Sequence, residues 1–391
     1  MGFTGHNLRM KPYQFFRLDR VGVVDITGDD REAIVHNLTT NEIKSLEVDQ
    51  GCETFVTDVR GKTLAHVMLY QLEDRIRMIG PHGPSTSVAE HVDRYTIRED
   101  AVAKVRDDDF CAIVLDAESA GKVLPDAVAK GSTARRVIEI GQQVVDAYTV
   151  PWLGDGTTVL LVESAKAESL AEQLVNSDVT EADEQAFHYR RIRSRFPWYG
   201  RDLDETNLPQ EADRDASAIS FTKGCYLGQE TVARLDALGQ VQKKLVCWKI
   251  ENGDRTRRVE TSEMRTQSDS AANDATDCET TAGKTAECET TASETTDCET
   301  VTGGITTRDD ASADNCSHDS KARAGINVKA GDKLDADSKT VGRLTSVAVG
   351  DDGTIIAIGF ARRSHFEAGS VAKGTDEVSG DVYTAIVSDC G

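Results

Sequence analysis

A long polar stretch constrains this sequence most, because it separates regions that can bury a core from one that cannot. Residues 252–324 contain no aromatic side chain, fifteen threonines and only four residues of the types Val, Ile, Leu and Met. Such a segment cannot bury enough apolar surface to offset its ordering entropy, so we predict that it is disordered. Cys-Glu-Thr recurs within it at 278–280, 288–290 and 298–300. We interpret this repeat as an expansion tolerated in a surface loop, the alternative being a metal- or redox-responsive segment.

The sequence before this insertion mixes helical and strand patterns. The two patterns do not alternate strictly, which favours an α+β fold over a doubly wound parallel sheet. An Asp29-x-x-Glu32 capping pattern predicts the start of the first helix. The predicted strands are 21–27, 63–72, 75–79, 112–115, 144–150 and 158–162, and the predicted helices are 29–46, 85–95, a helix from 119, and 165–174.

The sequence after the insertion changes to short strand-like runs separated by Gly and Asp turns. The run at 245–250, just before the insertion, has the same character. We therefore predict one small antiparallel β-barrel that is interrupted between its first and second strands. The remaining predicted barrel runs are 333–344, 346–349, 355–360 and 382–387. The predicted domains are a body at 1–244 and a barrel domain at 245–391, with 252–324 inserted in the latter.

The charge of the chain argues against several kinds of partner. Its 67 acidic and 45 basic side chains give a formal net charge of −22. Phosphate contacts require Lys and Arg, so we expect no nucleic-acid partner, and an anionic membrane would repel the chain. No stretch approaches the ~20 apolar residues of a membrane span, and no apolar signal region follows Met1, so we expect a cytoplasmic protein. Asp outnumbers Glu and Arg outnumbers Lys, which is typical of a halophilic acidic protein, the alternative being an ordinary acidic cytosolic one.

The turn around Cys225 is the most informative segment for chemistry. Gly224 and Gly228 keep this turn sterically open, and a helix is predicted to begin near Gly228. A helix N-terminus and the neighbouring ammonium of Lys223 both favour the thiolate form of a sulfur. The alternative is a buried structural cysteine in a turn whose glycines serve packing. The nine cysteines include no Cys-x-x-Cys pair, so we predict no metal site. The predicted apolar stripe of the helix is Val232, Leu235 and Leu238.

This segment carries a family resemblance. Residues 223–234, Lys-Gly-Cys-Tyr-Leu-Gly-Gln-Glu-Thr-Val-Ala-Arg, resemble the signature K-G-C-[FY]-x-G-Q-E-x-x-[AS]-R of the YgfZ family of folate-binding proteins. That family is similar to the T-protein, the aminomethyltransferase of the glycine cleavage system, and it includes mitochondrial iron–sulfur assembly factors. Weaker matches lie at 28–41, 191–202, 209–211, 341–346 and 358–361, so the resemblance covers roughly 15–250 and 325–390.

The resemblance implies a T-protein-like folate-binding body followed by a small C-terminal barrel. It implies tetrahydrofolate as the cofactor, and iron–sulfur client or assembly proteins as partners. Cys225 would be the functional thiol and Lys223 its activator. The other implied residues of the motif loop are Gly224, Tyr226, Gly228, Gln229, Glu230 and Arg234, the Glu and Arg fixing the loop. The implied folate-binding residues are Asn41, His66, Arg193, Arg195, Tyr199 and Asp202.

Three positions depart from the T-protein pattern. T-proteins carry a carboxylate pair where this chain has Ala65 and His66, which supply no acid. The T-protein glutamate that holds the pterin ring falls at Arg193, and the usual glycine falls at Arg195. A pterin is best held by a carboxylate that accepts two parallel N–H groups, which arginine cannot do. These departures argue against glycine-cleavage chemistry, although arginines could still meet the anionic glutamate tail of folate.

Two further features have alternative interpretations. His66 is either a general base near pH 7 or a half-buried strand histidine. The basic run of Arg190, Arg191, Arg193 and Arg195 is either an anion site, for folate or for an acidic loop of a partner, or a set of salt bridges to the surplus carboxylates.

We therefore predict a YgfZ-like folate-binding protein that supports iron–sulfur cluster assembly or repair. The alternative is a tetrahydrofolate-dependent aminomethyltransferase or another one-carbon transferase, so whether the protein is an enzyme is left open. A non-catalytic scaffold that binds no folate is the third possibility.

Overall fold

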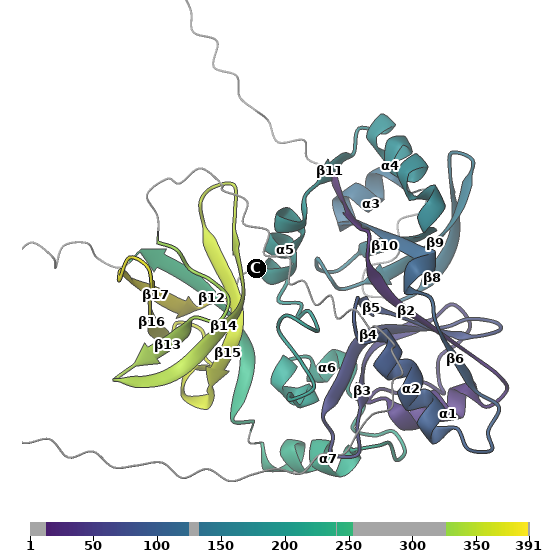
Figure 1. Cartoon of the computed structure of the whole chain (residues 1–391), viewed down its shortest axis with the longest axis horizontal. Coiled ribbons are helices and arrows are strands. Elements are labelled where there is room, and N and C mark those ends of the chain that lie inside the picture. Colours follow the sequence, from purple (N-terminus) through teal and green to yellow (C-terminus); the bar gives the residue numbers. More distant parts are fainter. Residues whose placement is uncertain (1–12, 125–132, 240, 253–325, 390–391) are drawn as a thin grey trace, which may run out of the picture. The chain divides into compact units, whose positions relative to one another are not determined.

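The computed structural model describes residues 13–124, 133–239, 241–252 and 326–389 (Figure 1). These residues all belong to one compact unit. The predicted disordered segment lies, beyond its first residue, outside them. The described chain forms two sheets covered by helices and a closed barrel, which confirms the predicted α+β class. None of the described helices is long and apolar enough to cross a membrane.

The first sheet has five antiparallel strands in the order β3-β4-β5-β2-β6. Two helices cover one of its faces, because their apolar side chains pack against the inward-facing residues of β2 and β4. The strands are β2 (Val21–Thr27), β3 (Gly51–Thr57), β4 (Thr63–Gln71), β5 (Ile76–Pro81) and β6 (Val102–Val105), and the helices are α1 (Arg31–Leu38) and α2 (Ser85–Tyr95).

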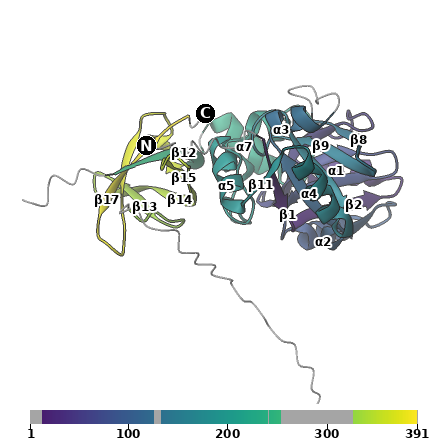
Figure 2. The same cartoon turned by 90° about the horizontal axis from the view of Figure 1, so that it is seen from above.

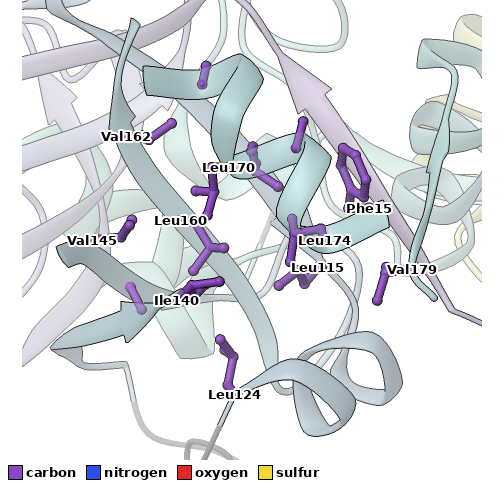
Figure 3. Packing of buried hydrophobic residues seen from close by; sticks show 14 of the residues in the cluster. Phe15, Leu115, Leu124, Ile140, Val145, Leu160, Val162, Leu170, Leu174 and Val179 are labelled. Atoms are coloured by element: carbon purple, nitrogen blue, oxygen red, sulfur yellow. The ribbon is translucent and has the colours of Figure 1, made fainter. Parts of the chain in front are cut away.

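The second sheet has six strands in the order β11-β1-β7-β10-β9-β8. Only the β1–β11 pair is parallel. Figure 3 shows its outer core, where Leu170 and Leu174 from a covering helix meet Leu160 and Phe15 from the strands. The strands are β1 (Gln14–Leu18), β7 (Phe110–Leu115), β8 (Arg135–Ile140), β9 (Gln143–Val150), β10 (Thr157–Glu163) and β11 (Thr180–Ala182), and the helices are α3 (Ala117–Val123) and α4 (Ala167–Asn176).

The two sheets pack face to face, and the alternation of side chains along each strand makes this possible. On β7, Val114 faces the first sheet, whereas Ile113 belongs to the outer core beneath α4. On β4, Tyr70 points between the sheets and Leu69 packs under α1 and α2. Both strands are therefore buried on both faces, which explains why β7 is apolar throughout and β4 is mostly apolar.

The C-terminal strands form the predicted barrel, with the closed order β12-β15-β14-β13-β16-β17 (Figures 1 and 2). Its core includes Trp248, Leu344 and Tyr383. The predicted run 333–344 was wrong in one respect, because Asp337 and Ser338 have positive φ and make a hairpin turn there. The strands are β12 (Lys243–Asn252), β13 (Lys333–Ala336), β14 (Lys339–Val349), β15 (Ile355–Arg362), β16 (Val371–Thr375) and β17 (Val382–Val387).

A helical segment joins the second sheet to the barrel. It includes α5 (Glu184–Arg193), α6 (Asp215–Ala218) and α7 (Gln229–Leu238). Its buried side chains share one apolar cluster with Phe55 of β3 and Leu245 of β12. Short 3-10 helices are present at Asp107–Asp109, Ser164–Lys166, Pro209–Ala212 and Arg363–His365.

The predicted helix at 29–46 is much shorter in the structure. It ends at Leu38, and Thr39 is extended. The chain leaves the helix there because Thr40 pairs with β3, donating its backbone N–H to the Phe55 carbonyl at 3.0 Å and accepting the Phe55 N–H on its hydroxyl at 3.1 Å. The predicted capping box is also wrong, since Asp30 occupies the N-cap and its side chain makes no capping bond.

Candidate functional site

Cys225 lies on an exposed loop between α6 and α7. Its thiol is free and reaches solvent, and Gly224 is exposed too, whereas Tyr226 is buried. The interpretation of Cys225 as a buried structural cysteine is therefore wrong. Helix α7 begins at Gln229, so the thiol precedes the helix and does not belong to its first turn.

Lys223 holds this loop against α1. Its ammonium donates hydrogen bonds to the carbonyl oxygens of His36 at 2.7 Å, Thr39 at 2.8 Å and Asn41 at 2.6 Å. The first two carbonyls belong to the C-terminal end of α1, where oxygens lack helical partners and a positive charge is favourable. Burial lowers the pKa of Lys223 to about 8, against the opposing effect of Glu42. Two of the ammonium hydrogen bonds thus cap α1 and the third goes to the Asn41 carbonyl beyond the helix. These three bonds occupy the ammonium group, which argues against the predicted role of Lys223 as an activator of the thiol.

Backbone contacts fix the rest of the loop. Gly228 has φ of 81°, and a side chain there would place its Cβ 2.5 Å from the Asp58 oxygen and from Gly61. Only glycine fits this close approach. Leu227 donates its N–H to the Asn37 carbonyl at 2.8 Å, and its own carbonyl accepts from a threonine hydroxyl of β3 at 2.8 Å. Cys225 is therefore presented on a rigid loop.

The rest of the motif lies on the outer side of α7. Glu230 and Arg234 are exposed, and neither makes a hydrogen bond or ion pair with any other described residue, so they do not fix the loop as predicted. Gln229 is partly buried and starts the helix. The predicted apolar stripe is only partly correct, since Val232 is buried but Leu238 is 55% exposed.

A cavity of about 480 Å³ lies where β3, β4 and β9 meet the helical segment. That volume is in the range of sites that hold small molecules and cofactors. A turn at 151–156 supplies a further part of the wall. The polar residues that line it are Cys52, Glu53, Thr133, Thr149, Asp155, Ser194, Arg214 and Ser217.

Glu53 and Arg214 form an ion pair on the cavity wall. The Arg214 Nε atom donates to the Glu53 carboxylate at 2.7 Å, and its Nη2 atom donates to the other carboxylate oxygen. Glu53 is only 4% exposed. Burial alone would raise the pKa of Glu53, but the hydrogen bonds from Arg214 and His66 outweigh it and hold the pKa at about 2. Glu53 is therefore ionised at neutral pH.

His66 is buried behind Glu53. Its Nε2 atom lies 2.7 Å from a Glu53 oxygen, and its ring stacks between Phe55 at 4.6 Å and Phe196 at 5.1 Å. Because the ionised carboxylate can only accept, we assign the Nε2 proton as the donor of this bond. His66 is a fully buried strand histidine that orients Glu53, and it does not itself line the cavity.

Three other polar groups on the wall are available to a ligand. Thr149 is only 5% exposed, and its hydroxyl has no hydrogen-bond partner among the described residues. Asp155 is exposed on a turn in which Gly154 and Gly156 have positive φ, and it too makes no hydrogen bond or ion pair within the described chain. Burial raises the pKa of Cys52 to about 12, so that thiol is neutral.

Asn41, a predicted folate-binding residue, does not line the cavity itself but is hydrogen-bonded to two residues that do. Its amide donates to the backbone oxygens of Glu53 at 2.8 Å and Ser217 at 2.9 Å, both of which line the cavity. The backbone carbonyl of Asn41 accepts a hydrogen bond from the Lys223 ammonium. Asn41 therefore connects the motif loop with the cavity wall.

The first two arginines of the basic run, Arg190 and Arg191, form ion pairs with aspartates inside the protein. Arg190 pairs with Asp116 and donates to Gln14 at 2.7 Å. Arg191 and Asp202 are wholly buried and pair at 2.5 Å. The salt-bridge interpretation therefore holds for these two arginines.

The other predicted folate residues also lie away from the cavity. Arg195 pairs with Asp213 at 2.9 Å, and its φ of 58° explains why a glycine suits this position in T-proteins. Arg193 is exposed and has no ion pair within the described chain. Tyr199 donates its hydroxyl proton to the Thr63 carbonyl at 3.1 Å. None of these side chains lines the cavity with Glu53.

The cavity residues that sequence reasoning missed are Glu53, Thr149, Asp155 and Arg214. A signal existed for Glu53, because Phe55 pairs with His66 in the β3–β4 hairpin and Glu53 lies two residues away on the same face. Thr149, Asp155 and Arg214 come from distant parts of the sequence and form no local motif. Among the described residues, no group of three or more His, Cys, Asp or Glu side chains could hold a metal ion.

The two sheets and the barrel define the class of fold to which T-proteins belong. A solved aminomethyltransferase T of the glycine cleavage system, from Bartonella henselae, superposes with a TM-score of 0.67. The alignment covers 96% of this chain and 84% of that one at 13% identity. The likeness therefore establishes the fold.

Relatives in sequence show a second likeness. A tRNA-modifying protein YgfZ from Yersinia pseudotuberculosis is 24% identical over 245 residues, covering 62% of this chain and 73% of the relative. The protein of the same name from Yersinia enterocolitica is 25% identical over 270 residues, covering 63% and 74%. No family model matches the chain. The chain is thus similar in sequence to YgfZ proteins, as the motif predicted, and has the fold of the T-protein.

Proposed function

We propose that the protein binds a tetrahydrofolate-type cofactor in the cavity beside Glu53 and supports iron–sulfur cluster assembly or repair through Cys225. The buried, unpartnered Thr149 hydroxyl carries the first half of this proposal, because an unsatisfied polar group on a cavity wall is costly unless a ligand or water meets it. The cavity also offers fixed charges at Arg214 and Asp155 for the polar edge of a heterocycle. The residues present thus fit a folate ring system.

The charge of Glu53 favours a binding role over one-carbon transfer. Glu53 on β3 is hydrogen-bonded to His66, which lies on β4, the strand where T-proteins carry their carboxylates. A general acid must hold a proton near the working pH, and a carboxyl whose pKa is about 2 does not. His66 is buried behind it. The cavity wall therefore supports cofactor binding better than aminomethyl transfer.

Cys225 supports the second half of the proposal. It is an exposed thiol on a rigid loop, as a residue that engages a partner protein must be. A single thiolate cannot hold an iron–sulfur cluster, so the remaining ligands would come from the client or from small thiols. The cluster is then cargo shared between two molecules.

The relatives are named tRNA-modifying proteins, which raises the question of tRNA. A chain with a net charge of −22 is poorly suited to bind the RNA backbone, because phosphate contacts need clustered Lys and Arg. We therefore propose that any role in tRNA modification acts through a client enzyme and involves no direct contact with tRNA.

Titration of tetrahydrofolate into the purified protein, in buffer of molar salt, tests the binding proposal. We expect saturable quenching of tryptophan fluorescence with one site per chain. Cys225→Ser should bind with unchanged affinity, because Cys225 does not line the cavity. An absence of saturable binding by the wild type would refute this half of the proposal. Formation of methylene-tetrahydrofolate from an aminomethyl donor would favour the transferase instead.

The thiol proposal is tested by complementation of a strain that lacks this gene. Cys225→Ser should fail to restore the activity of cluster-dependent enzymes, with a loss of about tenfold or more, because serine is a poor ligand for iron–sulfur clusters. Thr222→Ala changes a neighbouring exposed side chain of the same loop and should complement fully. Full rescue by Cys225→Ser would mean that the thiol has no such role.

A further inference from the structure

The second carboxylate of the cavity refines the proposed folate binding, on which this inference rests. Among the described residues, two carboxylate side chains line the cavity, Glu53 and Asp155. Both oxygens of Glu53 already accept charge-assisted hydrogen bonds from Arg214, and one also accepts from His66. Glu53 therefore has little capacity left to hold a ligand.

Asp155 has the opposite character. It lies between Gly154 and Gly156, whose φ angles of 104° and 80° form a tight turn on the cavity wall. Its carboxylate is exposed and has no hydrogen bond or ion pair within the described chain. Thr149, with its unpartnered buried hydroxyl, lines the same cavity from β9. Asp155 therefore offers two carboxylate oxygens that can accept hydrogen bonds, and Thr149 offers a hydroxyl that can donate one.

A pterin matches these two groups chemically. Its 2-amino-4-oxopyrimidine edge presents a ring N–H and an amino N–H side by side, which a carboxylate accepts as a bidentate pair. A neighbouring acceptor atom of the ring can accept a hydrogen bond from a threonine hydroxyl. We propose that Asp155 selects this edge of the cofactor, with Thr149 as a second contact. The pterin-holding carboxylate of this chain then comes from the turn before β10, whereas the corresponding glutamate position of T-proteins is occupied by Arg193.

The experiment compares two ring systems and two matched variants. Pterin carries the 2-amino group, and lumazine has an oxo group in its place, which repels a carboxylate. The wild type should bind pterin more tightly than lumazine. Asp155→Asn should weaken both tetrahydrofolate and pterin by about 10- to 100-fold, the usual cost of losing a charged hydrogen-bond partner. It should also abolish the preference over lumazine, which a merely structural change would not do.

Two controls keep the outcomes distinct. Asp351→Asn alters another exposed aspartate, in the β14–β15 turn, and should bind like the wild type. Thr149→Val should weaken tetrahydrofolate by a smaller factor while the protein stays folded by circular dichroism. If the wild type binds tetrahydrofolate and Asp155→Asn binds it equally well, this inference is wrong and the proposed function stands. If the wild type binds no folate or pterin, the proposed function itself fails.

Discussion

Arg214→Ala is expected to lower the free energy of unfolding by about 3–5 kcal/mol, because it leaves the buried Glu53 carboxylate without its cation. The Glu53 side chain is only 4% exposed in the folded protein. His66 would remain as its one hydrogen-bonding neighbour. Denaturant unfolding at molar salt, followed by fluorescence, measures the loss.

Two further variants separate this mechanism from simple loss of packing. Arg214→Met combined with Glu53→Gln removes both charges and should regain most of the lost stability. Arg193→Ala removes an exposed arginine that has no ion pair within the described chain, and should change stability by less than about 0.5 kcal/mol. Equal losses for Arg214→Ala and the double variant would show that the uncompensated charge is not the cause.

The same pair sets how stability depends on pH. The pKa of Glu53 is about 2 in the folded protein and 4.5 in an ordinary glutamate. A lowered folded-state pKa contributes stability that is fully present above about pH 4.5 and is lost as the pH falls from there towards 2. Arg214→Ala should flatten the stability profile in that window, with little change in its slope between pH 6 and 8.

Asp202→Ala should be comparably destabilising, again by about 3–5 kcal/mol, since it leaves Arg191 as an unpaired charge with no exposed surface. Asp202 accepts from Arg191 at 2.5 Å and from the Trp198 N–H at 2.9 Å. Its other oxygen accepts from the hydroxyls of Thr345 at 2.6 Å and Ser346 at 2.7 Å, both on β14. One carboxylate therefore ties the helical segment to the barrel.

The measurement that checks this role combines unfolding with folate titration. Asp202 does not line the cavity, so the folded fraction of Asp202→Ala should bind tetrahydrofolate with wild-type affinity. Glu205→Ala, a nearby exposed acidic residue, should leave stability within about 0.5 kcal/mol of the wild type. A variant with normal stability and impaired folate binding would instead support the contact with folate that the sequence implied for Asp202.

Local patterns were enough to predict most of the architecture. The runs at 144–150 and 158–162 correspond to β9 and β10 within one residue at each end, because apolar β-type residues bounded by turns define buried strands. The first helix was predicted too long, since its end is set by Thr40 pairing with Phe55, a tertiary contact with no local signal. The local sequence pattern therefore predicted whether a segment is a helix or a strand, whereas the end of α1 is set by tertiary packing.

The site shows the same division more sharply. The motif located Cys225, which the structure shows to be exposed. The role of Lys223 could not be read from the motif, because the carbonyls that it caps come from the end of α1, far away in the sequence. His66 likewise has its partner, Glu53, on a neighbouring strand. A sequence pattern can single out such residues, but it cannot give their role when their partners are distant in the sequence.

The strand order of the barrel has a consequence for how the chain folds. Among the described strands, β13 follows β12 in sequence but is not its neighbour in the ring, since β12 pairs there with β15 and β17. Lys249, for example, lies opposite Ile356 on one side and Ile386 on the other. Such pairing has a high contact order, which slows folding because distant segments must meet before any contact forms. The barrel can therefore close only after nearly the whole chain has been synthesised, whereas every strand of the two sheets precedes it in the sequence.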